Sequence, residues 1–185
     1  MLTHDIASAW ILKFAARLAP GARVLDLACG NGRHSKALAS LGCQVDAVDC
    51  DPTCGTLLAG VPGVSFACLD LESAHWPIEA GIYDAVVVCR YLYRPRLAAL
   101  AAALRPQGLL LYETFAMGQE RFGRPTNPDY LLQPFELART FAPLLHVLAF
   151  EDGVLPGPPP ARVQRLCAVR TGAGAPGPLT LPDDV

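Results

Sequence analysis

The sequence predicts an α/β protein built on a doubly wound, mostly parallel sheet, and three observations support this prediction. Strand-like runs alternate with helix-like runs over most of the chain, as in a series of β-α-β units. The strand-like runs, such as Ala85–Cys89 and Leu109–Tyr112, are apolar throughout, which is typical of strands covered by helices on both faces. The last two runs are joined by a short segment rich in Gly and Pro, too short for a helical crossover, which predicts an antiparallel hairpin.

The elements follow in order along the chain. An amphipathic helix is expected over Thr3–Ala19, because apolar residues recur there at helical spacing until Pro20 and Gly21. Parallel strands are expected near residues 23–28, 44–49, 64–69, 83–89 and 108–114. Helices separate most of them, near residues 32–41, 52–60 and 95–105.

The pattern changes after Glu113. A polar segment rich in Gly and Pro leads to a short helix over Pro134–Phe141 and then to the hairpin strands, Leu145–Glu151 and Arg162–Thr171. We expect one domain over residues 1–171 and a flexible tail over 172–185, where breakers are frequent and little can be buried. Because residues 115–133 combine irregular backbone with apolar side chains, we expect them to form a lid over a ligand. The alternative is a fixed Ω-like loop that packs permanently on the body of the domain.

Composition limits the function classes. The chain has 185 residues, of which 52% are hydrophobic and 17% charged, which excludes an intrinsically disordered protein. A net charge of −2 predicts neither a nucleic-acid partner nor an anionic membrane surface. No apolar run approaches the ~20 residues of a membrane span, and no signal-peptide pattern opens the sequence. Seven cysteines without metal-ligand spacing favour reduced thiols in the cytoplasm.

The most informative segment is VLDLACGNGRHS, residues 24–35. A strand leads to Asp26, a turn contains Gly30 and Gly32, and a helix begins near Arg33, so a ligand can approach both the backbone and the helix N-terminus. The dinucleotide-binding pattern G-x-G-x-x-G is incomplete here. The Asp26 carboxylate would also face a pyrophosphate with a like charge.

Two further acids end the next two strands. Asp49 can accept hydrogen bonds from both hydroxyls of a ribose, and by itself it suits NAD, FAD or S-adenosylmethionine (SAM) equally well. Asp70 can accept a bond from an adenine amino group while the Leu71 N–H meets a ring nitrogen. The alternative for Asp70 is a solvated carboxylate at a strand end. A helix cap, the alternative for Asp49, suits Asp51 better.

Three acids at the ends of consecutive strands beside a Gly-rich turn resemble the class I SAM-dependent methyltransferases over nearly the whole chain. The resemblance implies a Rossmann-like, seven-stranded sheet of order 3-2-1-4-5-7-6 with strand 7 antiparallel. It also implies SAM as cofactor. The implied cofactor residues are Asp26 and the turn Ala28, Cys29, Gly30 and Gly32 for the methionine part, Asp49 for the ribose, Asp70 and Leu71 for the adenine, and Cys89 for the ammonium group, with Cys50 as a further cofactor-binding residue.

More narrowly, residues 83–95 and 112–137 resemble the tellurite-resistance-type branch, which includes enzymes directed at thiols and small molecules. The chain lacks the Asn/Asp-Pro-Pro-Tyr motif of amino-group methyltransferases and the Pro-Cys nucleophile of cytosine-C5 enzymes. It also lacks the converging Asp and Asn ligands of metal-dependent enzymes, so no metal is expected.

Three residues near the expected methyl position are candidates for catalysis. Tyr91 or Arg94 would orient the nucleophile, and Glu113 would take its proton or bind a cationic group. The alternatives are a pocket wall for Tyr91 and a helix start for Arg94. Methyl transfer from a sulfonium is an in-line displacement that needs alignment more than a strong base.

We therefore predict a cytoplasmic SAM-dependent methyltransferase that acts on a small soluble acceptor. One alternative is an RNA- or protein-directed enzyme with a basic strip around the cleft mouth, made by Arg90, Arg94, Arg96, Arg121 and Arg124. The other alternative is a module that binds SAM without turnover.

Overall fold

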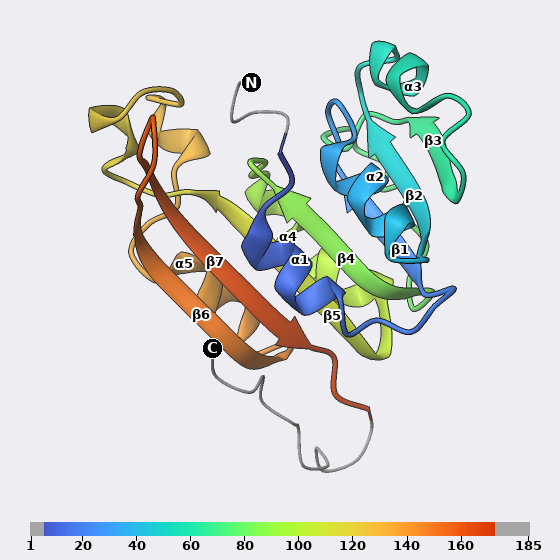
Figure 1. The fold of residues 1–185 in the computed structure, drawn as a ribbon. Coiled ribbons are helices and arrows are strands. Elements are labelled where there is room, and N and C mark those ends of the chain that lie inside the picture. Colours follow the sequence, from blue (N-terminus) through green and yellow to red (C-terminus); the bar gives the residue numbers. More distant parts are fainter. Residues whose placement is uncertain (1–5, 173–185) are drawn as a thin grey trace.

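The computed structural model describes residues 6–172, which form one seven-stranded sheet with helices on both faces (Figure 1). The strand order is β3-β2-β1-β4-β5-β7-β6. Strands β1 to β5 run parallel, whereas β7 pairs antiparallel with both β5 and β6. The predicted fold class and strand order are confirmed. The strands are β1 Arg23–Leu27, β2 Gln44–Asp49, β3 Val64–Cys68, β4 Tyr83–Cys89, β5 Leu104–Phe115, β6 His146–Leu155 and β7 Ala161–Val169.

The central strands are buried on both faces, as their apolar sequences predict. In β4, Val86 and Val88 face a core layer that includes α4 (Leu97–Ala103) and α5 (Glu136–Phe141). The alternate residue Val87 faces the other layer, which includes α1 (Ala9–Ala15) and α2 (Arg33–Ser40). This alternation follows from the two-residue repeat of a strand, and the mixed polar strand β6 is left at the edge.

The first helix is shorter than predicted. The helix was expected over Thr3–Ala19; its residues 3–5 lie outside the described residues, and α1 begins only after Ser8. Ser8 is extended (φ −60°, ψ 119°) and caps the helix, its hydroxyl accepting from the Ile11 N–H at 3.4 Å. Its own N–H donates to His34, so it is not available for a helical turn. The apolar residues before Ser8 recur at helical spacing, but the backbone there does not belong to the helix, and the Ile6 side chain is 60% exposed.

The ends of other helices and strands also differ from the predicted ones. The predicted helix over 52–60 is α3, Thr53–Leu58, and the helix expected over 95–105 is α4, preceded by a 3₁₀ turn at Arg94–Arg96. Strand β6 extends the hairpin to Leu155, because cross-strand pairing continues to the Pro-rich turn. Of the expected tail, residues 173–185 lie outside the described residues. Within residues 6–172, no helix is long and apolar enough to cross a membrane.

Candidate active site

The carboxyl ends of β1, β4 and β5 border a cavity of about 690 Å³. It lies where the strand order reverses, between β1 with β2 on one side and β4 with β5 on the other, which is where open α/β sheets bind ligands. The cavity is lined by Asp26, Ala28, Cys29, Gly30, Asn31, Arg33, His34, Glu72, Cys89, Arg90, Tyr91, Leu92, Thr114, Phe115, Arg124, Pro125 and Tyr130.

A second cavity of about 490 Å³ adjoins the first and shares four lining residues with it, namely Ala28, Glu72, Arg90 and Tyr91. It is otherwise lined by Asp49, Cys50, Asp70 and Leu71, so the two cavities form one groove along the sheet edge. Of the ten cofactor residues that the sequence suggested, Gly32 alone lines neither cavity.

The two glycines of the turn have different roles. Both have left-handed backbone, with φ of 54° at Gly30 and 72° at Gly32. A Cβ at Gly32 would overlap the Leu58 side chain, so packing of α3 against the turn requires this glycine. A Cβ at Gly30 would meet no heavy atom within 4 Å, and Gly30 lines the cavity. The backbone is therefore open to a ligand at Gly30, whereas the helix α3 occupies the space beside Gly32.

Asp26 is a buried acid at the inner wall of the groove, only 1% exposed. Its carboxylate accepts from the Ser35 hydroxyl at 2.6 Å. Burial raises the pKa of Asp26 to about 6, against the lowering effect of the Ser35 hydrogen bond. Asp26 is thus a negative charge that the protein only partly compensates, beside a cavity that can admit a cation.

Asp49 ends β2 with its carboxylate held by backbone. Oδ2 accepts from the Gly30 N–H at 2.9 Å, and Oδ1 accepts from the Asp51 N–H at 3.0 Å. These two bonds fix the carboxylate at the wall of the second cavity. The helix cap is supplied by Asp51, which accepts from the Thr53 N–H at 2.8 Å, as the sequence indicated.

Asp70 lies just beyond β3, on the loop that closes the second cavity. Its Oδ1 accepts from the Glu72 N–H at 2.9 Å, which holds the loop in a tight turn. Leu71 between them is buried. The sequence placed both residues at an adenine, and both line the second cavity.

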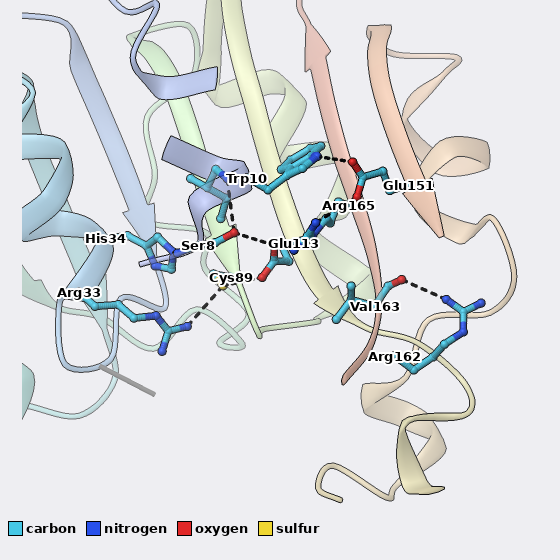
Figure 2. Close-up of polar contacts among 11 residues, drawn as sticks. Ser8, Trp10, Arg33, His34, Cys89, Glu113, Glu151, Arg162, Val163 and Arg165 are labelled. Carbon is cyan, nitrogen blue, oxygen red and sulfur yellow. Dashed lines mark hydrogen bonds and ion pairs between the residues drawn. The ribbon is translucent and has the colours of Figure 1, made fainter. Parts of the chain in front are cut away.

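Arg33 and His34, at the start of α2, and Cys89, at the end of β4, also line the first cavity. The Arg33 Nη2 atom donates to Cys89 Sγ at 3.4 Å, and the Ser8 N–H donates to His34 Nε2 at 3.0 Å (Figure 2). Burial, Arg33 and Arg90 lower the pKa of His34 to about 3, so its imidazole stays neutral. Burial and the nearby Glu113 raise the pKa of Cys89 to about 11, so its thiol also stays protonated.

The three residues predicted for catalysis occupy different positions. Tyr91 lines both cavities, and its hydroxyl donates to Glu72 Oε1 at 3.4 Å. Burial and Glu72 raise the pKa of the Tyr91 hydroxyl, which keeps it a donor. Arg94 and Glu113 line neither cavity.

Arg94 anchors the segment that follows β5. Its guanidinium forms an ion pair with Glu136 at 2.7 Å and donates to the Leu131 carbonyl at 2.8 Å. Through these bonds Arg94 holds the segment whose residues Arg124 and Tyr130 line the cavity, but Arg94 does not line the cavity itself. The anchored ends of the segment restrict the expected lid, because Leu131 and Leu132 are buried and Met117 N–H donates to the Leu132 carbonyl. The exposed part, residues 120–130, carries Arg124 and Tyr130 to the rim of the cavity.

Glu113 is the centre of a polar network behind the cavity (Figure 2). Its Oε2 accepts from the Ser8 hydroxyl at 2.7 Å and from Arg165 Nε at 2.9 Å. Arg165 also pairs with Glu151 at 3.0 Å, and Glu151 accepts from the Trp10 indole at 3.0 Å. The network ties the start of α1, the end of β5 and the hairpin together, and it contacts the cavity through His34 and Cys89.

Sequence reasoning missed several of these residues. Arg33 and His34 follow the glycine turn directly, and this position at the start of α2 was a signal that they line the cavity. Ser8 and Arg165 gave no such signal, because they reach Glu113 across 105 and 52 residues of sequence. Within residues 6–172, no group of three or more His, Cys, Asp or Glu side chains is arranged to hold a metal ion.

The chain is similar in sequence to a family of proteins and to several individual proteins. A family model described as a methyltransferase domain matches residues 24–108. A demethylmenaquinone methyltransferase from Beutenbergia cavernae is 37% identical over 133 residues, which cover 68% of this chain and 51% of that protein. A ubiquinone biosynthesis O-methyltransferase from Xanthomonas axonopodis pv. citri is 36% identical over 112 residues, covering 54% of this chain and 46% of that protein. The chain thus spans about half the length of these two relatives.

Among solved structures, TehB from Haemophilus influenzae superposes with a TM-score of 0.72 at 20% identity, over 90% of this chain and 63% of that one. This likeness shows the fold. The matched family segment contains the glycine turn together with Asp26, Asp49 and Asp70. With the observed strand order and the groove at the switch point, the match to a methyltransferase domain supports a class I SAM-dependent methyltransferase.

Proposed function

We propose that the chain transfers the methyl group of SAM to a small-molecule acceptor by in-line displacement. The observation that carries the proposal is the single groove at the switch point, which acids from three consecutive strands line on one side. One half of the groove suits the cofactor, and the other half, under residues 120–130, suits an acceptor.

The donor set fits SAM. Asp26 is a partly uncompensated buried charge that an ammonium group would neutralise. Gly30 leaves open space at the backbone, and Asp49 is already oriented to accept from ribose hydroxyls. We assign the methionine part to Asp26, Ala28, Cys29, Gly30 and the Cys89 backbone, with Arg33 on the carboxylate, the ribose to Asp49 and Cys50, and the adenine to Asp70 and Leu71. When bound, SAM supplies the electrophilic methyl group.

The protein's own residues then bind, orient and exclude water. Tyr91 lines both halves of the groove and keeps its proton, so we assign it to orienting the acceptor. Arg94 and Glu113 act as positioning residues. Arg94 holds residues 127–136, and Glu113 holds the wall formed by Ser8 and His34. Alignment without a strong base is enough for this type of displacement.

A small acceptor is supported by the size of the groove and by relatives whose names refer to ubiquinone biosynthesis and demethylmenaquinone. Two of the five arginines of the basic strip that an RNA- or protein-directed enzyme would need are bonded within the chain. Arg94 is tied to Glu136, and Arg96 donates to the carbonyls of Ser73 and Ala74 at 2.7 and 2.8 Å. We place the reaction in the cytoplasm, because all seven cysteines are free thiols.

Calorimetry with S-adenosylhomocysteine (SAH) tests the cofactor assignment. Asp49→Ala removes the carboxylate expected to accept from the ribose and should weaken SAH binding by roughly 1–3 kcal/mol. Asp51→Ala is the matched control, since its carboxylate is two residues away and caps α3. Equal SAH affinity of the Asp49 variant and the wild type would contradict the assignment. A screen of small metabolites with methyl-labelled SAM separates an enzyme from a module that binds SAM without turnover.

A further inference from the structure

We propose that His34 binds the carboxylate of the methionine part of SAM, as a neutral hydrogen-bond donor through its Nδ1–H. This inference rests on the proposed function and adds a residue to the cofactor site. It also gives a role to the polar network behind the cavity, in which Ser8 links His34 to Glu113 (Figure 2).

His34 is a buried residue at the wall of the first cavity. It is the second residue of α2, which begins directly after the glycine turn. Only 2% of His34 is exposed, yet it lines the first cavity and not the second. The residues assigned above to the methionine part line this same cavity, whereas Asp49 and Asp70, assigned to the ribose and the adenine, line the second. His34 is therefore on the methionine side of the groove.

A hydrogen bond from the backbone fixes the position of the proton on the imidazole. The Ser8 N–H can only donate, and it donates to His34 Nε2 at 3.0 Å, so Nε2 is the nitrogen without a proton. Burial, together with Arg33 and Arg90, lowers the pKa of His34 to about 3, so the imidazole holds a single proton near neutral pH. That proton is on Nδ1, which makes the Nδ1–H a donor.

The Nδ1–H needs a partner that the protein does not supply. Within residues 6–172, the bond from Ser8 is the only hydrogen bond of the His34 side chain, so the Nδ1–H has no acceptor there. Polar groups shielded from bulk water are nearly always hydrogen-bonded in native proteins. In the methionine part of SAM, the ammonium group can only donate, and the positively charged sulfonium does not accept. The carboxylate is therefore the acceptor that suits His34.

A neutral imidazole suits a position beside Arg33. Arg33 and His34 are consecutive residues that line the same cavity, and a carboxylate with two oxygens can accept from both. The charges of Arg33 and Arg90 disfavour a protonated imidazole, as the lowered pKa of His34 shows. His34 can therefore add a hydrogen bond to the carboxylate without adding a further positive charge to this wall.

The polar network holds the imidazole in this state. The Ser8 hydroxyl donates to Glu113 Oε2 at 2.7 Å, and Glu113 forms an ion pair with Arg165 at 2.9 Å. Ser8 is thus fixed by β5 and the hairpin while its N–H bonds to His34. Ser8, Glu113 and Arg165 line neither cavity. They are therefore positioning residues, which set the tautomer of His34 without contact with the cofactor.

Nuclear magnetic resonance of the wild type tests the state of the imidazole. Proton–nitrogen correlation spectra should show a proton on Nδ1 of His34 and none on Nε2. SAH should shift the Nδ1–H resonance, whereas decarboxylated SAH, which lacks only the carboxylate, should leave it nearly unchanged. The exposed His75 and His146 are internal references. A proton on Nε2 of His34, or a resonance that SAH does not shift, overturns the inference.

Two substitutions separate the contact at Nδ1 from the contact at Nε2. His34→Gln can keep an acceptor for the Ser8 N–H but has no donor at the Nδ1 position, so SAH should bind about tenfold more weakly. Its affinity for decarboxylated SAH should stay within about twofold of the wild type. His34→Asn keeps a donor at the Nδ1 position and loses the acceptor for Ser8. It should therefore lose stability in thermal melts but bind SAH within about threefold of the wild type.

Calorimetry with both ligands gives outcomes that decide the inference. It is overturned if His34→Gln binds SAH as tightly as the wild type, or if that variant loses affinity equally for SAH and decarboxylated SAH. A loss in His34→Asn as large as the loss in His34→Gln also overturns it. If His34→Gln does not fold, the resonance shift in the wild type decides. Failure of the wild type to bind SAH would instead contradict the proposed function, so the two failures are distinguishable.

Discussion

Replacing Asp26 with Asn should stabilise the protein while weakening its hold on the cofactor. Asn has the same shape and keeps an oxygen that can accept from Ser35, but it removes the buried negative charge. Burial raises the pKa of Asp26 from 3.8 to about 6. A difference of about two pKa units corresponds to roughly 3 kcal/mol that the charged carboxylate costs the folded state.

The sign gives a distinct pH dependence. Between about pH 4 and pH 6 the folded chain holds a proton at Asp26 that the unfolded chain has lost, so wild-type stability falls as the pH rises through this window. Asp26→Asn lacks this titration. The variant should therefore match the wild type below about pH 4 and exceed it by about 2–3 kcal/mol above about pH 7.

Urea unfolding at about pH 4 and about pH 7 measures the difference in stability between Asp26→Asn and the wild type. Asp51→Asn is the control, because the pKa of Asp51 is shifted in the opposite direction. Asp51 is an exposed cap whose pKa is lowered by its bonds from Thr53, so its loss should bring no gain at high pH. SAH affinity of the wild type should rise with pH up to about pH 6, because an ammonium group binds the ionised carboxylate, and it should be flat in Asp26→Asn. An Asp26→Asn variant less stable than wild type at about pH 8 would refute this reasoning.

Three further predictions concern other parts of the site. Gly32→Ala should destabilise the fold by at least about 1 kcal/mol, because the new Cβ would meet the Leu58 side chain and the backbone is left-handed. Gly30→Ala should instead affect SAH affinity more than stability. Thermal melts and calorimetry compare the two variants, and a larger loss of stability in Gly30→Ala would contradict the assignment. Glu113→Gln removes a buried ion-pair partner and should cost roughly 3 kcal/mol in chemical denaturation; a loss of methyl transfer with unchanged stability would instead make Glu113 a catalytic residue. Hydrogen exchange should show the Leu132 amide protected without ligand and residues 120–130 slowed by SAH; fast exchange at Leu132 would mean that the whole segment opens.

The sequence predicted the sheet well because strands buried on both faces leave a clear signal. The Val86–Val88 run fixed both the type of strand and its central place, and the short connection before β7 fixed the hairpin. The acids at strand ends were also visible, because a parallel sheet brings its carboxyl ends to one edge. The strands, the hairpin and the acids at the strand ends could be predicted because each depends on the sequence close to it.

The remaining parts depend on contacts between distant residues. Glu113 was interpreted as catalytic from its position near the end of β5, and Arg94 from its position after β4, but each has a partner that the local sequence does not reveal. Arg165 lies two strands further along the chain, and Glu136 lies on the far side of the irregular segment. The start of α1 was misjudged for the same reason, because Ser8 bonds to His34 and Glu113 instead of continuing the helix.

The position of β7 in the sheet determines when Glu113 gains its cationic partner during synthesis. This strand emerges last from the ribosome among the seven, yet it inserts between β5 and β6 and brings Arg165 to Glu113. A nascent chain that ends before residue 165 holds a carboxylate at the end of β5 without its cationic partner. The residues that line the two cavities lie between Asp26 and Tyr130, so none of them belongs to the hairpin. The ion pair between Glu113 and Arg165 therefore forms only after all the residues of the cavity walls have been synthesised.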